Sequence, residues 1–242
     1  MNRILFEKDE IVDGRVTFGG IRAEHVLGVL HGEVGQTLKT GEVNGLVGTS
    51  EIVAIEPSAP TVTVAVSHAA PSLPPWVDLI LAPPRPRVMK RLLPQLAALG
   101  VGRLFLVGAK KVEKDFWGAT LLKEENWRPL FVDGLMQAGT SALPTLETRR
   151  NFRKFVTEEL DALWPTGPRL LAHPYGAPSR PPQLSQPSPS RLLLAIGPEG
   201  GWTDEEVALL EARGFVRRSL GPRILRTDTA TVALLAQLMT SC

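Results

Sequence analysis

The chain has 242 residues, of which 43% are hydrophobic and 21% charged, an ordinary composition for a globular protein with a sizeable core. The lone cysteine, Cys242, excludes an internal disulfide, and no His/Cys group has zinc spacing, so we expect no metal. No apolar run approaches the ~18 residues of a membrane span, and the charged first twenty residues fit neither a signal peptide nor an anchor, so we expect a cytoplasmic protein.

The net charge of +2 is unevenly distributed along the chain. Residues 1–70 hold five Lys and Arg against nine Asp and Glu, whereas residues 71–242 hold 22 against 16. A basic second part favours a polyanionic partner, and solvated surface charge explains the same counts about equally well.

Residues 1–70 have the pattern of short strands and are predicted to form a small β-barrel-like domain. The stretch TVTVAVSH over 61–68 places valine at every second position, as in a half-buried strand, and the glycine-punctuated stretch 41–56 resembles a hairpin. Helical periodicity is limited to a turn near 23–31. The proline-rich residues 71–75 are the predicted linker.

From residue 76 onward, apolar strands alternate with helices. We expect strands at 76–83, 103–108, 169–173, 191–196 and near 216–220, and helices at 86–100, about 118–138, 151–163, 204–213 and from about 229. Pro94 should kink the first of these helices. This alternation is typical of a mostly parallel sheet covered on both faces, so 76–242 is predicted to be one α/β domain. Residues 178–190, with five prolines, are predicted to be an exposed loop.

The stretch Gly197-Pro198-Glu199-Gly200-Gly201 separates an apolar strand from a helix. Thr203 and Glu206 form a capping box at the start of that helix, and Gly214 is placed to end it. A glycine-rich loop at the carboxyl end of a parallel strand presents bare backbone N–H groups to a ligand. Its spacing matches neither a dinucleotide fingerprint nor a phosphate-binding loop, and a glycine-rich turn without a ligand is about as common.

Two further loops follow strands in the same part of the chain. His173-Pro174 ends one strand, and taken alone such a residue is more often a strand-end histidine than a catalyst. The stretch SLGPRILRTDTATVALLAQLM over 219–239 leads into a helix that is apolar nearly all round. Thr227 or Asp228 is expected to cap this helix, which should be buried in the fold or against a second subunit.

The order of these pieces resembles a known family. His-Pro after an apolar strand, then IGPEGGWTDEE, then LGPRILRTDTA before a buried helix, is similar to the SPOUT class of RNA methyltransferases. More closely, it resembles the bacterial 16S ribosomal RNA uridine-N3-methyltransferase family. The resemblance extends over the chain, strongly from residue 191 onward and loosely before, where EHVLGVLHGEVGQTL (24–38) is similar to the start of that family's PUA-like barrel.

The resemblance implies an α/β fold with two domains. These are a PUA-like, RNA-binding β-barrel at 1–70 and a parallel-sheet SPOUT methyltransferase domain with a deep trefoil knot at 76–242. It also implies methylation of uridine N3 in small-subunit ribosomal RNA by a homodimer packed through the knot. Three loops would hold S-adenosylmethionine, with the expected contacts His173, Pro174, Gly197, Glu199, Gly200, Gly201, Leu220, Gly221, Ile224, Leu225, Arg226 and Thr229.

Because the donated methyl group is already activated, the protein needs only to position the acceptor base and to remove its proton. Asp228 is the expected acceptor of the uracil N3 proton, and Arg226 the expected stabiliser of the developing anion. The base must be unpaired or flipped. The expected phosphate contacts are Arg85, Arg87, Lys90, Arg91, Lys110 and Lys111, with Lys114, Arg149, Arg150, Arg153 and Lys154 as further basic side chains.

The chain departs from the family pattern at several positions. Gln95 and Ala98 replace the common Lys and Glu, Thr140 and His31 replace usual arginines, and Asp228 replaces a usual Glu. The target nucleotide is therefore left open. The alternatives are a related enzyme that methylates another base or a ribose 2′-oxygen of a different RNA, and a non-catalytic RNA-binding protein with a degenerate cofactor site.

Overall fold

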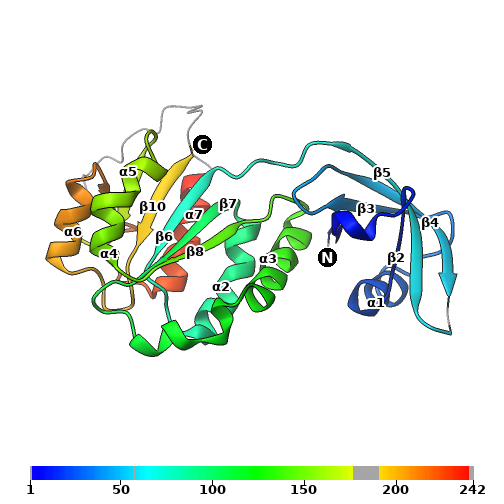
Figure 1. Cartoon of the computed structure of the whole chain (residues 1–242), viewed down its shortest axis with the longest axis horizontal. Coiled ribbons are helices and arrows are strands. Elements are labelled where there is room, and N and C mark those ends of the chain that lie inside the picture. Colours follow the sequence, from blue (N-terminus) through cyan, green and yellow to red (C-terminus); the bar gives the residue numbers. More distant parts are fainter. Residues whose placement is uncertain (1, 57, 177–190, 240–242) are drawn as a thin grey trace. The chain divides into compact units, whose positions relative to one another are not determined.

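The computed structural model describes residues 2–56, 58–176 and 191–239 (Figure 1). The chain forms two compact units, Met1–Pro74 with Val132–Leu143 and Pro75–Phe131 with Pro144–Cys242. The segment 132–143 therefore belongs with the N-terminal unit, although the sequence boundary assigned it to the second domain. The proline-rich loop expected at 178–190 lies outside the described residues.

The N-terminal unit is built on a five-stranded mixed sheet. Its elements are β1 (Ile4–Phe6), η1 (Lys8–Glu10), β2 (Arg15–Phe18), α1 (Gly20–Gly28), β3 (Thr37–Glu42), β4 (Val47–Glu56) and β5 (Thr61–Ala70). The strand order is β1-β3-β4-β5-β2, with β1 parallel to β3 and the other neighbours antiparallel. Val62 and Val64 of β5 are buried against Phe6, Phe18 and Val26 of α1. The alternating valines thus predicted β5, and the helical turn expected at 23–31 is a helix that begins earlier, at Gly20.

Residues 132–143 are tied to the N-terminal unit by hydrogen bonds. The Arg3 Nε donates to the Gly139 carbonyl at 2.9 Å, and the Ser141 hydroxyl donates to the Gly45 carbonyl at 2.8 Å. Thr140, which stands where the family commonly has arginine, shares a 2.8 Å hydrogen bond with the Ser72 hydroxyl. This departure from the family pattern therefore has a structural role in this unit.

The C-terminal unit contains a six-stranded parallel sheet, so the α/β class with a parallel sheet is as predicted. Its strands are β6 (Val77–Leu81), β7 (Val101–Val107), β8 (Thr145–Arg149), β9 (Arg169–Ala172), β10 (Leu192–Ile196) and β11 (Val216–Arg218), in the order β11-β9-β10-β6-β7-β8. The sequence reading missed β8. Its residues TLETR contain one apolar side chain, and the strand lies at the edge of the sheet, where it pairs with β7.

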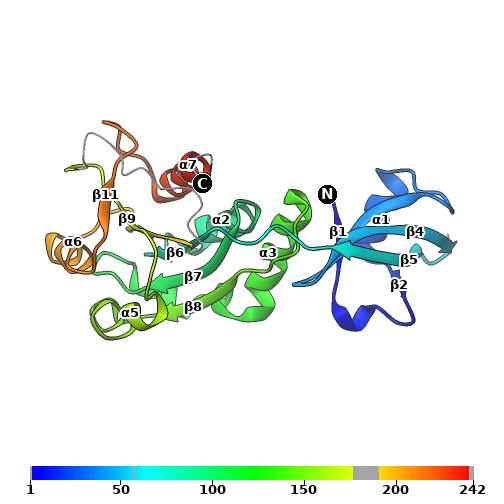
Figure 2. The same ribbon diagram turned by 90° about the horizontal axis from the view of Figure 1, so that it is seen from above.

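Helices cover both faces of this sheet, with α4, α5 and α6 on one side and α2 and α7 on the other (Figures 1 and 2). The helical elements are α2 (Pro86–Ala98), η2 (Lys114–Gly118), η3 (Thr120–Leu122), α3 (Glu124–Ala138), α4 (Phe152–Lys154), the π-helical η4 (Phe155–Glu159), α5 (Leu160–Leu163), α6 (Asp204–Glu211) and α7 (Thr227–Met239). The helix expected at 151–163 is thus three short consecutive pieces, whereas α2 continues through Pro94. None of the helices in the described ranges is long and apolar enough to cross a membrane.

The ends of α6 follow the predicted capping signals. The Thr203 hydroxyl accepts from the Glu206 N–H at 3.3 Å, and the Glu206 carboxylate accepts from the Thr203 N–H at 2.8 Å. At the other end Gly214 has φ of +80°, and Phe215 donates its N–H to the Leu210 carbonyl. These caps fix where the loop after β10 ends and α6 begins.

Candidate functional site

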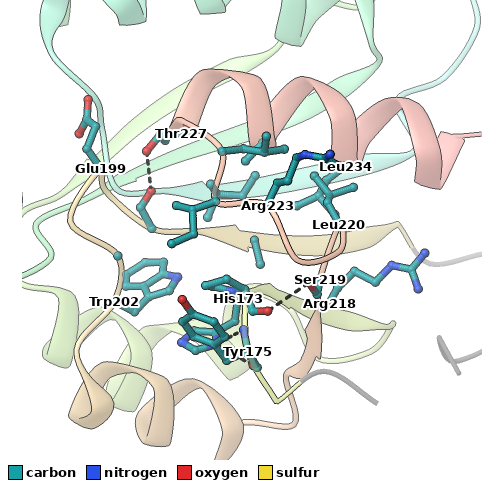
Figure 3. A pocket seen from close by; sticks show the side chains of 18 of the residues that line it. His173, Tyr175, Glu199, Trp202, Arg218, Ser219, Leu220, Arg223, Thr227 and Leu234 are labelled. Atoms are coloured by element: carbon teal, nitrogen blue, oxygen red, sulfur yellow. Dashed lines mark hydrogen bonds between the residues drawn. The ribbon is translucent and has the colours of Figure 1, made fainter. Parts of the chain in front are cut away.

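A pocket of about 370 Å³ lies at the carboxyl ends of β9, β10 and β11 (Figure 3). It is lined by residues 172–175 after β9, 196–202 after β10, and 218–221 and 223–225 after β11. Thr227, Ala230 and Leu234 of α7 complete the lining. Parallel strands bring their carboxyl ends to one edge of the sheet, which is where open α/β sheets bind ligands.

Side-chain hydrogen bonds link the loops and the helix that line the pocket. The Ser219 hydroxyl lies 3.2 Å from the Pro174 carbonyl, which links the loop after β11 to the loop after β9. The Thr227 hydroxyl donates to the Gly197 carbonyl at 3.3 Å, which links α7 to the glycine-rich loop (Figure 3). These hydrogen bonds therefore fix the positions of the pocket walls relative to one another.

The glycines of residues 197–201 meet two different demands. A Cβ on Gly197 would lie 3.0 Å from the Trp202 Nε1, so the indole ring would have to move by a few tenths of an ångström to admit a side chain there. Gly201 has φ of +70°, a conformation that L side chains rarely adopt, and its N–H closes a turn onto the Pro198 carbonyl at 2.8 Å. The loop thus keeps its backbone close to the pocket.

Two buried polar atoms in the pocket wall lack a partner. In the described part of the chain, four buried side-chain nitrogens make no hydrogen bond, and two of them, Trp202 Nε1 and Arg218 Nε, belong to residues lining the pocket. Figure 3 shows these two side chains on opposite sides of it. Buried donors are almost always satisfied in native proteins, so both fit a polar ligand or ordered water.

His173 and Tyr175 form the wall provided by the loop after β9. The His173 Nδ1 lies 2.8 Å from the Tyr175 carbonyl, and the two rings meet edge to face with centroids 6.2 Å apart. The Tyr175 side chain is 63% exposed. The pocket therefore has an aromatic ring that a planar ligand can contact.

The structure brings most of the predicted cofactor residues into the pocket lining. These are His173, Pro174, Gly197, Glu199, Gly200, Gly201, Leu220, Gly221, Ile224 and Leu225. Arg226, Asp228 and Thr229 are not among the lining residues. The remaining lining residues were not named as cofactor contacts from the sequence, and they are Ala172, Tyr175, Ile196, Pro198, Trp202, Arg218, Ser219, Arg223, Thr227, Ala230 and Leu234. Two of them could have been predicted from their position in the sequence, because Trp202 directly follows the glycines and Tyr175 directly follows His-Pro.

The start of the last helix corrects one sequence expectation. Because α7 begins at Thr227, neither Thr227 nor Asp228 precedes the helix as a cap. The Thr227 side chain instead reaches Gly197, and the half-buried Asp228 carboxylate accepts from the Thr229 N–H at 2.9 Å. The exposed Arg226 lies just before the helix, and its carbonyl accepts from the Ala230 N–H at 2.8 Å. Arg226 and Asp228 therefore lie next to the pocket in sequence but outside its lining.

The six predicted phosphate contacts are all exposed, and two of them already have protein partners. Arg85 pairs with Glu113 at 2.9 Å, and this hydrogen bond raises the pKa of the Arg85 guanidinium. Lys111 donates its Nζ to the Gly200 carbonyl at 2.7 Å. Arg87, Lys90 and Arg91 lie on or beside α2, and Lys110 follows β7. Within the described ranges no group of three or more His, Cys, Asp or Glu is placed to hold a metal.

Comparison with known proteins gives the class to which this fold and pocket belong. A family model described as an RNA methyltransferase domain matches residues 71–239, which include the whole parallel sheet and all three pocket loops. The C-terminal unit is therefore an RNA methyltransferase domain.

Individual relatives narrow the assignment. Ribosomal RNA small subunit methyltransferase E of Treponema pallidum is 30% identical over 239 residues, which are 98% of this chain and 90% of that protein. The Synechocystis protein of the same name is 36% identical over 121 residues, 48% of this chain and 38% of that protein. The chain belongs to the ribosomal RNA small subunit methyltransferase E family.

Solved structures share the fold along almost the whole chain. A Legionella pneumophila protein, solved with the bound cofactor S-adenosylmethionine, is 25% identical with a TM-score of 0.75 and covers 99% of this chain and 97% of its own. Ribosomal RNA small subunit methyltransferase E of Neisseria gonorrhoeae, solved with S-adenosylmethionine, is 22% identical with a TM-score of 0.77 and the same coverage. The second of these supports the fold alone.

Proposed function

We propose that this chain transfers a methyl group from S-adenosylmethionine to N3 of a uridine in 16S ribosomal RNA. The observation that carries the proposal is the pocket that three loops form at the carboxyl edge of the sheet, where Ser219 bonds to Pro174 and Thr227 bonds to Gly197. The Legionella protein solved with S-adenosylmethionine supports the choice of cofactor. A ribosomal substrate would place the enzyme in the cytoplasm.

The pocket suits a ligand with an aromatic base, a polar sugar and an amino-acid tail. Ile196, Leu220, Ile224 and Leu234 give it apolar surface, and the unpartnered donors of Trp202 and Arg218 give it polar contacts. Pockets of a few hundred Å³ with this mixture are typical of cofactor sites. When bound, S-adenosylmethionine supplies a methyl group already activated by its sulfonium.

The protein then has to position the acceptor and remove its proton. We assign the proton of uracil N3 to the Asp228 carboxylate, which is half-buried at the first turn of α7 and directly follows the pocket residue Thr227. The exposed Arg226 guanidinium would stabilise the negative charge that develops on the ring. Because both residues lie outside the pocket lining, the base would approach from the solvent side of the loop before α7.

The remaining expectations from the family resemblance belong to this proposal. The trefoil knot and the RNA-binding role of a PUA-like barrel at 1–70 are proposed, with 76–242 as the methyltransferase domain. A homodimer is proposed because the loop before α7 exposes apolar side chains, among them Ile224, which is 75% exposed. A second copy packing over this loop would cover them.

The test is nucleoside mass spectrometry of 16S ribosomal RNA from cells that lack the protein. We expect 3-methyluridine to disappear and to return when the wild-type chain is supplied. Asp228→Asn should restore it about 10²- to 10⁴-fold more slowly while leaving S-adenosylmethionine affinity unchanged. Loss of a ribose-methylated nucleoside instead would favour the ribose alternative, and an unchanged nucleoside profile would refute the proposal.

A further inference from the structure

A second hollow, of about 460 Å³, lies at the carboxyl ends of β7 and β8 and against the start of α6. Its charged lining residues are Lys110, Arg150, Arg153, Glu205 and Glu206, and we call it the basic groove. It shares the carboxyl edge of the sheet with the cofactor pocket, and it brings together three of the basic side chains that the sequence offers to RNA phosphates, Lys110, Arg150 and Arg153.

The three cations of the basic groove are available to a ligand. Lys110, Arg150 and Arg153 are exposed, and no carboxylate of the described residues forms a salt bridge with any of them. Arg149, the neighbour of Arg150, is different because it pairs with Glu147 at 2.7 Å and with Glu159 at 2.8 Å. Unpaired clustered cations at a concave surface attract polyanions.

The two carboxylates of the groove are not equivalent. Glu206 is buried and accepts hydrogen bonds from the N–H groups of Thr203 and Lys110, each at 2.8 Å, so its charge is compensated within the fold. Glu205 is exposed, and it is the one groove carboxylate with no such bond among the described residues. The groove therefore presents three cations against one free carboxylate.

Arg150 is held in place by its surroundings. Its guanidinium lies over the Trp117 ring, 5.7 Å from the centroid, and donates to the Trp117 carbonyl at 3.1 Å. A Cβ on Gly108 would lie 1.9 Å from the Arg150 carbonyl, so the ends of β7 and β8 are in close contact. A preorganised guanidinium suits the two oxygens of a phosphate.

The basic groove and the cofactor pocket share a wall. The ring of Phe152, in the groove, contacts the ring of Trp202, in the pocket, with centroids 5.2 Å apart. Lys110 bonds to Glu206 through its N–H, and the adjacent Lys111 bonds to Gly200 through its Nζ. A strand held in the groove would therefore lie against the loop that forms the cofactor pocket.

We propose that the basic groove binds phosphates of a single-stranded RNA segment that flanks the nucleotide to be methylated. The inference rests on the proposed function, because it takes the cofactor pocket as the reacting centre. Lys110, Arg150 and Arg153 contact phosphate oxygens, and Glu205 opposes them.

The test measures binding of a fluorescein-labelled oligouridylate of about twelve nucleotides by anisotropy, from ~50 to ~200 mM KCl. The double variant Lys110→Gln/Arg153→Gln should raise Kd roughly tenfold to hundredfold and reduce the slope of log Kd against log salt by about 1.4. Glu205→Gln should lower Kd about threefold, an effect that a folding defect does not produce. Lys123→Gln removes one exposed charge outside the groove, 3.8 Å from Glu125, and should leave Kd unchanged.

Calorimetric titration of the same proteins with S-adenosylmethionine separates the two proposals. Wild type and all variants should bind the cofactor alike. If the groove variants then bind the oligonucleotide as the wild type does, or the wild type does not bind it, the groove proposal is wrong. Displacement of the oligonucleotide by an equal concentration of inorganic phosphate, at matched ionic strength, would contradict the proposal, because a strand that contacts the groove through several phosphates should bind more tightly than one phosphate. A wild-type chain that binds no S-adenosylmethionine refutes the proposed function instead.

Discussion

The two units of this chain differ in how they place charge and polar groups. Residues 1–74 and 132–143 hold five Lys and Arg against ten Asp and Glu, whereas the remaining residues hold 22 against 15. In the mixed sheet of the N-terminal unit, the buried Thr40 and Ser50 bond to each other at 2.6 Å and Thr40 bonds to His68 at 2.8 Å. At the carboxyl edge of the parallel sheet, by contrast, the buried Trp202 Nε1 and Arg218 Nε lack partners among the described residues, and three exposed cations line the basic groove.

The largest expected effect is on the stability of the C-terminal unit. Asp78 of β6 is fully buried and pairs with Arg103 and with Arg191, whose side chains are 30% and 41% exposed. Asp78→Asn should lower the free energy of unfolding by about 2 to 3 kcal/mol, because two cations lose a buried partner but keep some access to water. Urea unfolding followed by tryptophan fluorescence measures this directly, since all five tryptophans belong to this unit.

Asp161 provides the matched control for Asp78. It also pairs with two arginines, Arg169 and Arg213, but its side chain is 50% exposed. Asp161→Asn should cost less than about 1 kcal/mol. Equal losses from the two substitutions would show that burial does not decide the contribution of these ion pairs.

The next effect separates two glycines of the pocket loop. Gly197→Val would push against the Trp202 ring, which packs on Phe152, and should weaken S-adenosylmethionine binding about tenfold to hundredfold. Gly200→Ala would meet the side chain of Lys111, whose Cδ lies 2.9 Å away and can move, so a loss below about threefold is expected. Calorimetry measures both affinities, and the opposite ranking would contradict the assigned role of Trp202.

The stability of the N-terminal unit should depend on pH through His68. Burial lowers the pKa of His68 below its ordinary value of 6.5, so the folded unit favours the neutral ring. Its contribution to stability is complete above pH 6.5 and is lost as the pH falls through the lowered pKa of the folded state. The hydrogen bond from Arg22 lowers the carboxyl pKa of Glu10. Its contribution to stability is therefore lost only at pH values below 4.5, the ordinary pKa of the carboxyl group.

Hydrogen exchange of the β3, β4 and β5 amides is the measurement for His68, because the N-terminal unit has no tryptophan. Protection should decrease below pH 6.5 in the wild type, after correction for the intrinsic exchange rate, and His68→Gln should remove that decrease. If His68→Gln keeps the same pH dependence, the titrating group is another residue.

The smallest expected effect concerns Lys111. Lys111→Met removes the exposed hydrogen bond from Nζ to the Gly200 carbonyl and should weaken cofactor binding by about twofold to threefold. Lys111→Arg retains a donor and should lie closer to the wild type. If the substitution weakens RNA binding more than cofactor binding, Lys111 contacts RNA phosphates, as the sequence predicts, and does not act mainly through Gly200.

Strong local signals explain which elements the sequence could predict. The capping box of Thr203 and Glu206 and the apolar run of β10 depend on neighbouring residues, and both are present in the structure. The edge strand β8 has no such signal, because Thr145, Glu147 and Arg149 leave it polar on one face. Its place beside β7 is decided by tertiary pairing.

The residues of the site also fall into those that local sequence predicts and those that depend on tertiary structure. Glycine loops are visible in sequence, so ten of the 21 lining residues could be named in advance. The contributions of α7 depend on where that helix begins. With its start at Thr227, residues 227, 230 and 234 share the face toward the pocket, and Asp228 and Thr229 turn elsewhere. Arg218 could not be found in advance, because its buried Nε becomes apparent only when β11 and α7 lie together.

A crystal structure of the chain with S-adenosylmethionine tests the central claim most directly. We predict ligand density between residues 197–201 and 220–225, in contact with Trp202 and the loop at His173. Density elsewhere on the chain, or an empty pocket at saturating ligand, would contradict the assignment of these three loops as the cofactor cradle.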